Sequence, residues 1–178
     1  QDIDLKSISY NQPSQLEALN TTLDEILLNH DNAMIIGEDI ESPYGGAFKV
    51  TMGLSVKYPG RVINTPISEA AIVGIGCGLA IAGMRPIIEI MFGDFITLAY
   101  DQIVNHATKF NEMYDGKIEV PLIIRTPMGA GRGYGATHSQ SLEKFFAGVP
   151  GMNLIILHGR SRIKNLYNSL FSDINKPT

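Results

Sequence analysis

The sequence predicts an α/β domain built on a mostly parallel sheet with helices on both faces. Segments with strand-like and helix-like apolar spacing alternate along the chain. The expected strands are short continuous apolar runs, which is typical of strands that are covered on both faces. The chain has 178 residues and an apolar share of 44%, enough for one domain with a large core. We therefore treat residues 1–178 as a single, nearly complete domain.

Apolar spacing and turn residues predict the order of the elements. Helices are expected at residues 14–29, 51–58, 69–82, 96–113, 139–147 and 161–172. Strands are expected at residues 33–37, 61–64, 86–91, 120–125 and 153–157. Ser68 is a suitable N-cap for the helix that follows it, and Gly83 ends that helix. Residues 175–178 are typical of a helix exit that leads into another strand, so we expect the C-terminal end of the domain to be truncated.

Unusual loops follow several of the expected strands, at residues 38–50, 64–69 and 126–139. The carboxyl ends of parallel strands meet at one edge of a sheet, and ligands bind in the crevice outside that edge. We therefore expect these loops to gather at one edge and to form a ligand site there.

Composition excludes several classes of protein. The net charge is -4 and no basic run occurs, which argues against a nucleic-acid partner. The longest apolar stretch, Ala70–Ala82, is interrupted by glycines and is shorter than the roughly 20 residues that a membrane span needs. Cys77 is the only cysteine, so neither an intrachain disulfide nor a cysteine-based metal site is expected, and no other cluster has metal-ligand spacing. The first residues do not resemble a signal peptide, so we expect an intracellular protein.

Glu69 is the first candidate for chemistry. A carboxylate in the first turn of a helix is stabilised by the helix dipole, so glutamate is common there for structural reasons alone. The helix that follows is apolar on almost every side, however, and a buried carboxylate needs a partner because an unpaired buried charge is costly. A ligand nitrogen is one such partner, and both interpretations remain open from position alone.

His138, Phe92 and Phe95 are further candidates. His138 ends the glycine-rich segment 128–137, where it suits either a surface or capping role or proton transfer near neutral pH. Phe92 and Phe95 follow the third expected strand, and they suit either core packing or stacking on a planar heterocycle. The glycine-rich segment fits neither a P-loop nor a dinucleotide fingerprint. Its glycines are expected to let the backbone pass closely over a ligand or a neighbouring subunit.

Several stretches, in the same order along the chain, resemble the β subunit of E1. E1 is the decarboxylating, thiamine-diphosphate-dependent component of pyruvate, branched-chain 2-oxoacid and acetoin dehydrogenase complexes. The matching stretches are residues 36–40, 45–54, 64–70, 89–95, 101–107, 127–142 and 149–152. The resemblance covers roughly residues 14–160 and implies the fold of a thiamine-diphosphate pyrimidine-binding domain.

The resemblance also implies roles for individual residues. Glu69 matches the glutamate that hydrogen-bonds N1′ of the cofactor's aminopyrimidine and favours its imino tautomer, which removes the C2 proton of the thiazolium. Phe92 matches the aromatic residue that packs on the pyrimidine ring, with Phe95 nearby. His138 matches a histidine that assists proton transfer during decarboxylation and acyl transfer to a lipoyl group. Glu38 lies in the motif beside the pyrimidine pocket and is carried over as a supporting acid.

The sequence departs from complete enzymes of this type. No Gly-Asp-Gly motif occurs, so the diphosphate and Mg²⁺ of thiamine diphosphate are expected on a domain outside this chain, which supplies no metal ligand itself. The fragment alone should therefore be inactive. The expected partners are an E1 α subunit or a fused α-like domain, a second β-like chain in a heterotetramer-type assembly, and the lipoyl domain of E2. The expected location is the cytoplasm, or the mitochondrial matrix in a eukaryote.

Other functions remain open from the sequence. A transketolase-like or deoxyxylulose-phosphate-synthase-like enzyme shares the domain and the glutamate, although residues 101–106 and 137–143 favour E1. A non-catalytic α/β assembly module is the alternative from a different class, and the joint presence of Glu69, Phe92 and His138 argues against it. The sequence does not specify which 2-oxoacid is used.

Overall fold

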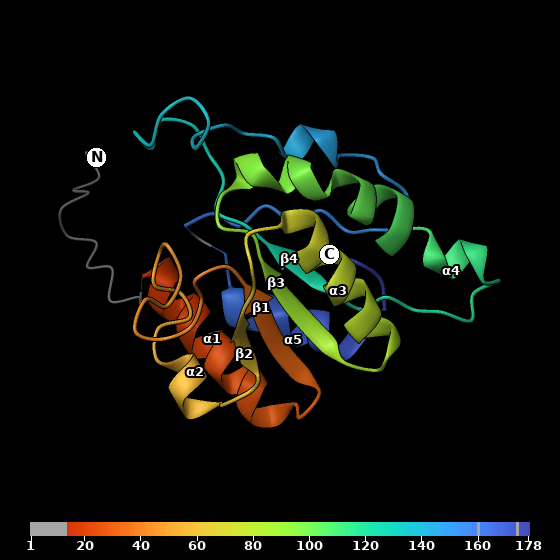
Figure 1. Ribbon diagram of the computed structural model, residues 1–178, viewed down its shortest axis with the longest axis horizontal. Coiled ribbons are helices and arrows are strands. Elements are labelled where there is room, and N and C mark those ends of the chain that lie inside the picture. The colour runs from red at the N-terminus through yellow and green to blue at the C-terminus, as the bar shows by residue number, and fades with distance from the viewer. Residues whose placement is uncertain (1–13, 160, 174) are drawn as a thin grey trace, which may run out of the picture.

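The computed structural model describes residues 14–159, 161–173 and 175–178, and within them a parallel four-stranded sheet has the order β2-β1-β3-β4 (Figure 1). The strands are β1 (Ala33–Gly37), β2 (Val62–Asn64), β3 (Arg85–Glu89) and β4 (Ile123–Arg125). In the register, Gly37 lies opposite Asn64 and Glu89, and Glu89 lies opposite Arg125. The carboxyl ends of the strands therefore meet at one edge, as expected for this fold class.

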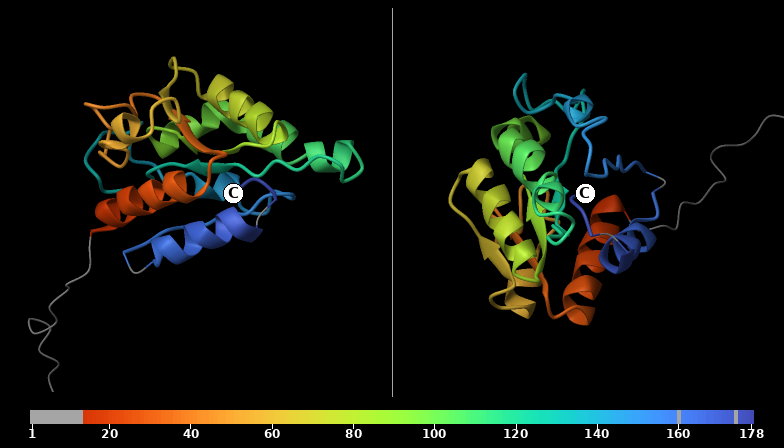
Figure 2. Two further views of the ribbon diagram at one scale, coloured as in Figure 1. Left: turned by 90° about the horizontal axis from the view of Figure 1, so that it is seen from below. Right: turned by 90° about the vertical axis from the view of Figure 1, so that its right-hand side faces the viewer.

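Helices cover both faces of the sheet (Figure 2). One face carries α3 (Glu69–Ile81), a 3₁₀ helix (Gly93–Ala99) and a π-helix (Gln102–Ala107), and the other carries α1 (Gln15–Asn29) and α5 (Ile163–Asp173). The short helices α2 (Leu54–Lys57) and α4 (Phe110–Met113) lie in the connections. No helix in the described ranges is long and apolar enough to cross a membrane.

The central strands β1 and β3 are buried on both sides. Ile36 and Ile88 pack into the core cluster that contains α3, whereas Ile35 and Ile87 pack into the cluster that contains α1 and α5. Full burial of a side chain of this size stabilises the folded state by about 1.5–3 kcal/mol relative to exposure. This two-sided burial explains the continuous apolar runs of the sequence.

Side-chain caps fix the starts of the two long helices. At α1, the Ser14 hydroxyl accepts from the Glu17 N–H at 3.2 Å, and the Glu17 carboxylate accepts from the Ser14 N–H at 2.8 Å. At α3, the Ser68 hydroxyl accepts from the Ala71 N–H at 3.4 Å, which confirms the expected cap. Glu69 is consequently held as the first residue of α3, at the carboxyl edge of the sheet.

The expectation of one long helix over residues 96–113 is wrong. The segment is divided into the 3₁₀ helix, the π-helix and α4. At the end of the π-helix, the Thr108 hydroxyl donates to the Val104 carbonyl at 2.8 Å, and the Thr108 N–H donates to Ile103 O at 3.1 Å. The side chain thus takes the acceptor that an α-helix would give to the backbone N–H, and the main-chain bond moves one residue further back.

The expected strand at residues 153–157 is also wrong. Pro177 and Thr178 lie along β4 instead, where the Ile124 N–H donates to Thr178 O at 2.8 Å and the Thr178 N–H donates to Leu122 O at 3.1 Å. Asn153 binds these two residues through its N–H, which donates to Pro177 O at 2.9 Å, and through its side-chain amide, which donates to the Thr178 hydroxyl at 3.1 Å. Residues 153–157 and β4 both line a cavity of about 640 Å³. The helix expected at residues 139–147 is reduced to a 3₁₀ turn, Glu143–Phe145.

Candidate active site

Polar side chains without partners mark the carboxyl edge of the sheet. The residues directly after β1, β2 and β4 are Glu38, Thr65 and Thr126, and each has a buried side-chain oxygen with no hydrogen-bond partner among the described residues. Buried polar atoms are nearly always hydrogen-bonded in folded proteins, so such a cluster requires an explanation. Its position outside the carboxyl ends of parallel strands is the usual place for a ligand.

Glu38 and Glu69 form a pair of buried acids at this edge. Their side chains belong to residues that are only 7% and 6% exposed. Burial raises the pKa of Glu38, and repulsion by Glu69 and Asp39 raises it further, while the Ser68 N–H opposes the change. Neither acid takes part in an ion pair within the described part of the chain. Two adjacent buried carboxylates without a cation are costly, so a proton or a ligand is needed to compensate them.

Close packing of backbone and helix fixes the position of this pair. A Cβ on Gly37, the last residue of β1, would lie 2.7 Å from the Glu89 carbonyl oxygen. A Cβ on Gly76 in α3 would lie 2.3 Å from Cδ1 of Ile88 in β3. Only glycine allows these approaches. As a result α3 packs tightly on the sheet, and its first residue, Glu69, is brought to the end of β1, where Glu38 follows.

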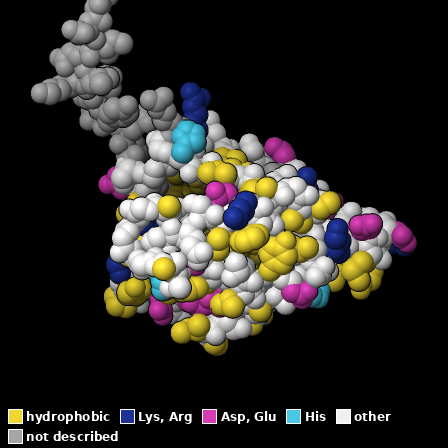
Figure 3. Space-filling model, turned by 90° about the horizontal axis from the view of Figure 1, so that it is seen from above, with side chains coloured by type: hydrophobic (Ala, Val, Ile, Leu, Met, Phe, Trp, Pro, Cys, Tyr) yellow, Lys and Arg dark blue, Asp and Glu magenta, His cyan; other side chains and the backbone are white. Residues whose placement is uncertain are grey.

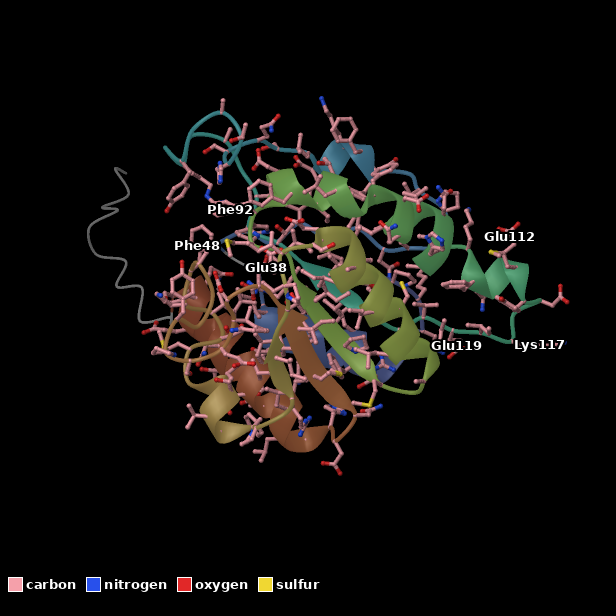
Figure 4. All side chains as sticks on the ribbon, in the orientation of Figure 1. Glu38, Phe48, Phe92, Glu112, Lys117 and Glu119 are labelled. Atoms are coloured by element: carbon pink, nitrogen blue, oxygen red, sulfur yellow. The ribbon has the colours of Figure 1, made fainter. Side chains whose placement is uncertain are left out.

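An aromatic cluster lies at the same end of the molecule. Phe92 and Phe95 both make edge-to-face contacts with His138, with ring centroids 4.8 and 5.1 Å apart, respectively. Phe92 also contacts Phe48 at 5.6 Å and Tyr134 at 5.9 Å. Figure 4 shows Glu38, Phe48 and Phe92 at one end of the sheet, and the charged residues Glu112, Lys117 and Glu119 at the other. The cluster provides apolar ring surface beside the buried acids.

Asp94 and Gln140 hold the loop that carries His138. The Asp94 carboxylate accepts from the Gln140 side-chain amide at 2.7 Å and from the Gln140 N–H at 3.3 Å. The Gly93 N–H donates to Pro127 O at 3.0 Å at the other end of the loop. His138, two residues before Gln140, is thereby held against Phe92, and its Nδ1 lies 3.0 Å from the Thr137 hydroxyl oxygen. No hydrogen bond to its Nε2 atom is found within the described residues.

A third buried acid at the edge, Glu89, has a different environment. It forms an ion pair with Arg125 from the neighbouring strand, and the Tyr167 hydroxyl lies beside the guanidinium. Burial lowers the pKa of Arg125, but the charge and hydrogen-bond interactions with Glu89 and Tyr167 together outweigh it, so the pKa lies above its ordinary value. Burial also raises the pKa of Tyr167. A Cβ on Gly46 would lie 3.1 Å from Glu89 Oε1, so the 38–50 loop rests directly on this pair.

Comparisons with known proteins agree with this architecture. Residues 11–178 match the family model described as "Transketolase, pyrimidine binding domain". The chain belongs to this family.

Individual relatives of this pyrimidine-binding domain are subunits of larger enzymes. The pyruvate dehydrogenase E1 component subunit beta-1, mitochondrial, of Arabidopsis thaliana is 40% identical over 158 residues, which are 88% of this chain and 43% of that protein. The acetoin:2,6-dichlorophenolindophenol oxidoreductase subunit beta of Cupriavidus necator is 40% identical over 147 residues, 78% of this chain and 44% of that protein. The chain thus spans less than half the length of these curated relatives.

Solved structures show the same fold. A chain of the structure titled "Split gene transketolase, inactive beta4 tetramer" superposes with a TM-score of 0.71 at 20% identity, over 93% of this chain and 49% of that chain. Transketolase from Leishmania mexicana superposes with a TM-score of 0.63 at 19% identity, over 93% of this chain and 24% of that chain. At this level of identity the likeness concerns the fold alone.

The pyrimidine-binding domain brings the candidate residues into two groups. Glu38 and Glu69 interact with each other, and Phe92, Phe95 and His138 contact one another. Sequence reasoning missed Phe48 and Tyr134 of the aromatic cluster, although the glycines before Phe48 and around Tyr134 were a signal of exposed loop residues. It also missed the Asp94–Gln140 clamp, whose partners are 46 residues apart. Among the described residues, no three His, Cys, Asp or Glu side chains gather as a metal-binding group.

Proposed function

We propose that this chain is the pyrimidine-binding part of the E1 component of a 2-oxoacid dehydrogenase complex. In this function, E1 decarboxylates a 2-oxoacid on thiamine diphosphate and transfers the acyl group to lipoamide. The observation that carries the proposal is the pair of buried acids without a cation, Glu38 and Glu69, at the carboxyl edge of the sheet. The identity of 40% with E1 β subunits supports the same conclusion.

The aminopyrimidine of thiamine diphosphate fits the chemistry of this edge. The ring has nitrogen atoms that exchange protons with a carboxylate, and an amino group that donates to oxygen acceptors. Glu38 Oε1 and the Thr65 and Thr126 hydroxyls are buried acceptors without a partner in the described chain. Phe92 offers an aromatic face for a planar heterocycle. Glu69 and Phe92 would hold the pyrimidine, with Phe95 and Glu38 supporting them.

Thiamine diphosphate, when bound, supplies the carbon nucleophile and the electron sink for decarboxylation. Glu38, whose pKa is raised, is suited to hold a proton within the acid pair. Glu69 is then the carboxylate that holds a proton at N1′ of the pyrimidine. His138 Nε2 moves a proton to or from the substrate, since Nδ1 is engaged with Thr137. The aromatic rings place apolar surface beside His138, and interactions between charges are stronger in such surroundings than in water.

The complete site requires partners outside this chain. We propose that the diphosphate and Mg²⁺ bind to an E1 α subunit or a fused α-like domain, and that a second β-like chain and the E2 lipoyl domain complete the assembly. Exposed apolar side chains support such interfaces, among them Ile67 before α3 and Ile75 on it. Others, such as Leu98 and Phe145, belong to elements at the top of Figure 1, where Figure 3 shows apolar groups between polar ones. We expect the protein in the cytoplasm, or in the mitochondrial matrix in a eukaryote.

The test uses the full-length protein with any partner that co-purifies. Reduction of an electron-accepting dye is measured with pyruvate, branched-chain 2-oxoacids and 2-oxoglutarate, with and without thiamine diphosphate. The proposal predicts cofactor-dependent turnover that collapses in Glu69→Gln, and the preferred acid identifies the complex. Absence of both turnover and cofactor binding would contradict it and favour an assembly module.

A further inference from the structure

The glycine-rich loop brings a single guanidinium to the aromatic cluster. Arg132 lies between Gly131 and Gly133, whose φ angles of +73° and +79° are rarely adopted by other residues. These two residues turn the chain on both sides of Arg132. Its guanidinium carbon lies 4.7 Å from the centroid of the Phe48 ring and 5.3 Å from that of Tyr134. Arg132 is thus half-buried and held over aromatic rings.

Arg132 differs from Arg61 and Arg125 in its lack of hydrogen-bond acceptors. Arg125 is paired with Glu89, and Arg61 donates to the backbone carbonyls of Leu27, His30 and Ala33. Arg132 forms no ion pair and no hydrogen bond within the part of the chain that the structure describes. The planar fork of N–H donors is therefore held in place while its hydrogen-bonding capacity remains unused.

The position of Arg132 relates it to the predicted reaction centre. The Phe48 ring contacts the Phe92 ring at 5.6 Å, and the Phe92 ring contacts the His138 ring at 4.8 Å. Phe48 and Phe92 are drawn at the same end of the sheet in Figure 4. Arg132 and His138 therefore contact the same aromatic cluster through different rings, Arg132 through Phe48 and His138 through Phe92. A small ligand on this cluster would have a proton-transfer group near one ring and a fixed cation near the other.

We propose that Arg132 binds the carboxylate of the 2-oxoacid substrate. The inference rests on the proposed function and adds the residue that selects an acid over a neutral carbonyl compound. A carboxylate that enters an aromatic site loses its hydration and needs a counter-charge, and a guanidinium fork provides two parallel hydrogen bonds for it. The diphosphate of the cofactor is the other oxyanion in such an enzyme. Arg132 serves the substrate, and the experiment separates these two ligands.

This role has a kinetic consequence. The carboxylate is charged when the substrate binds and is lost as neutral CO₂, so its bonds to Arg132 weaken as the reaction proceeds. Loss of Arg132 should therefore raise KM for a 2-oxoacid more than it lowers kcat. A residue that only stabilises the loop would affect acids and neutral carbonyl compounds alike.

The experiment measures ligand binding in the full-length assembly loaded with thiamine diphosphate. The probes are methyl acetylphosphonate, an anionic pyruvate analogue that is not decarboxylated, and its neutral counterpart dimethyl acetylphosphonate. The dissociation constants of both probes are determined by titration calorimetry for the wild type, Arg132→Gln and Arg132→Lys. The dissociation constant of thiamine diphosphate is determined in a separate titration of the same proteins before the cofactor is added. Lys144→Gln is the matched control, because Lys144 lies over the exposed Phe145 ring on a different element, the 3₁₀ turn Glu143–Phe145.

In Arg132→Gln, the Kd of the anionic probe should rise about 10- to 100-fold, as for loss of a charge-assisted bidentate contact. The neutral probe, the cofactor and the Lys144→Gln control should stay within twofold of the wild type, and Arg132→Lys should be intermediate. Equal losses for both probes, or no loss for the anionic one, would overturn the inference. So would weaker cofactor binding with unchanged probe binding, which would assign Arg132 to the diphosphate. Failure of the wild type to bind thiamine diphosphate would instead remove the proposed function itself.

Discussion

Three buried acids at the carboxyl edge of the sheet differ in whether a cation compensates them. Glu89 is 4% exposed and is paired with Arg125, which the Tyr167 hydroxyl also contacts. Glu38 and Glu69 are buried to nearly the same extent, 7% and 6% exposed, but they repel each other and form no ion pair within the described chain. Glu38, Glu69 and Glu89 are therefore buried to a similar extent, and they differ in that only Glu89 has a cationic partner.

This difference distinguishes a charge that stabilises the fold from charges that serve a ligand. A buried ion pair whose hydrogen bonds are satisfied holds neighbouring elements together, here β3, β4 and the overlying 38–50 loop. Two uncompensated acids reduce the stability of the folded state and are retained where a ligand makes use of them. The comparison predicts that substitution of the first pair affects mainly stability and that substitution of the second affects mainly activity.

The largest effect is expected for Glu69→Gln on catalysis. The amide is nearly isosteric, but it lacks the negative charge that holds a proton on the pyrimidine. Turnover in the full-length assembly should fall by about 10²- to 10⁴-fold, the range for loss of a group that positions a proton. Dye-reduction assays at saturating cofactor check this value. Retention of more than a tenth of the activity would show that Glu69 is not the group concerned.

A large effect on stability is expected for Arg125→Met. Removal of the guanidinium leaves Glu89 buried without a partner and should lower the free energy of unfolding by about 3–5 kcal/mol. The double variant Arg125→Met/Glu89→Met should lose less than the single one, since no unpaired charge remains. Lys57→Met, which breaks the exposed pair with Asp24, should have a much smaller effect than either, because water screens an exposed ion pair. Urea unfolding measures all three, and a double variant less stable than Arg125→Met would contradict the account.

A smaller effect is expected where the 38–50 loop touches the ion pair. Gly46 and Gly60 have similar φ angles, +82° and +76°, but a Cβ meets Glu89 Oε1 at 3.1 Å only at Gly46, and nothing within 4 Å at Gly60. Both alanine substitutions should cost roughly 1–2 kcal/mol for the left-handed backbone. Gly46→Ala should cost more, because it also displaces the Glu89 carboxylate. Equal thermal unfolding temperatures for the two variants would count against the contact.

The smallest effect concerns the pH dependence that Glu38 contributes. Its pKa in the folded protein is raised above the ordinary value of 4.5, so the folded state binds the proton more tightly than the unfolded state. The resulting stabilisation is complete below the ordinary value and is lost as pH rises through the raised pKa. Glu38→Gln does not show this pH-dependent loss. The difference between its urea-unfolding midpoint and that of the wild type should therefore shift in favour of the variant as pH rises, and then become constant above the raised pKa. A constant difference between the two proteins would refute the assignment.

The sequence allowed prediction of features that depend on neighbouring residues. The Ser68 cap, the start of α3 at Glu69 and the two-sided burial of β1 and β3 follow from local patterns. The break in the expected helix depends on how one Thr108 hydroxyl is directed, and the missing strand at residues 153–157 depends on Pro177 and Thr178 lying along β4. Periodicity contains neither piece of information.

In the candidate site, too, some features could be predicted from the local sequence and others could not. Glu69, Phe92 and His138 were candidates one by one, from their positions after strands or at a helix start and from residue type, whereas Glu38 entered only through the family resemblance. The pairing of Glu89 with Arg125 was not, because these residues are 36 positions apart and meet only through the register of β3 and β4. Nor did composition indicate that Arg132 would lie over Phe48. Roles that depend on a partner distant in sequence required the fold.

The most direct test of the central claim compares Glu89→Gln with Glu69→Gln in one urea-unfolding experiment on the full-length protein at neutral pH without cofactor. Glu89→Gln should lose about 3 kcal/mol or more, because it leaves Arg125 buried without its counter-charge. Glu69→Gln should be at least as stable as the wild type, because it relieves the repulsion with Glu38. If Glu69→Gln were destabilised as much as Glu89→Gln, Glu69 would be a structural residue, and the distinction between paired and unpaired acids would be contradicted.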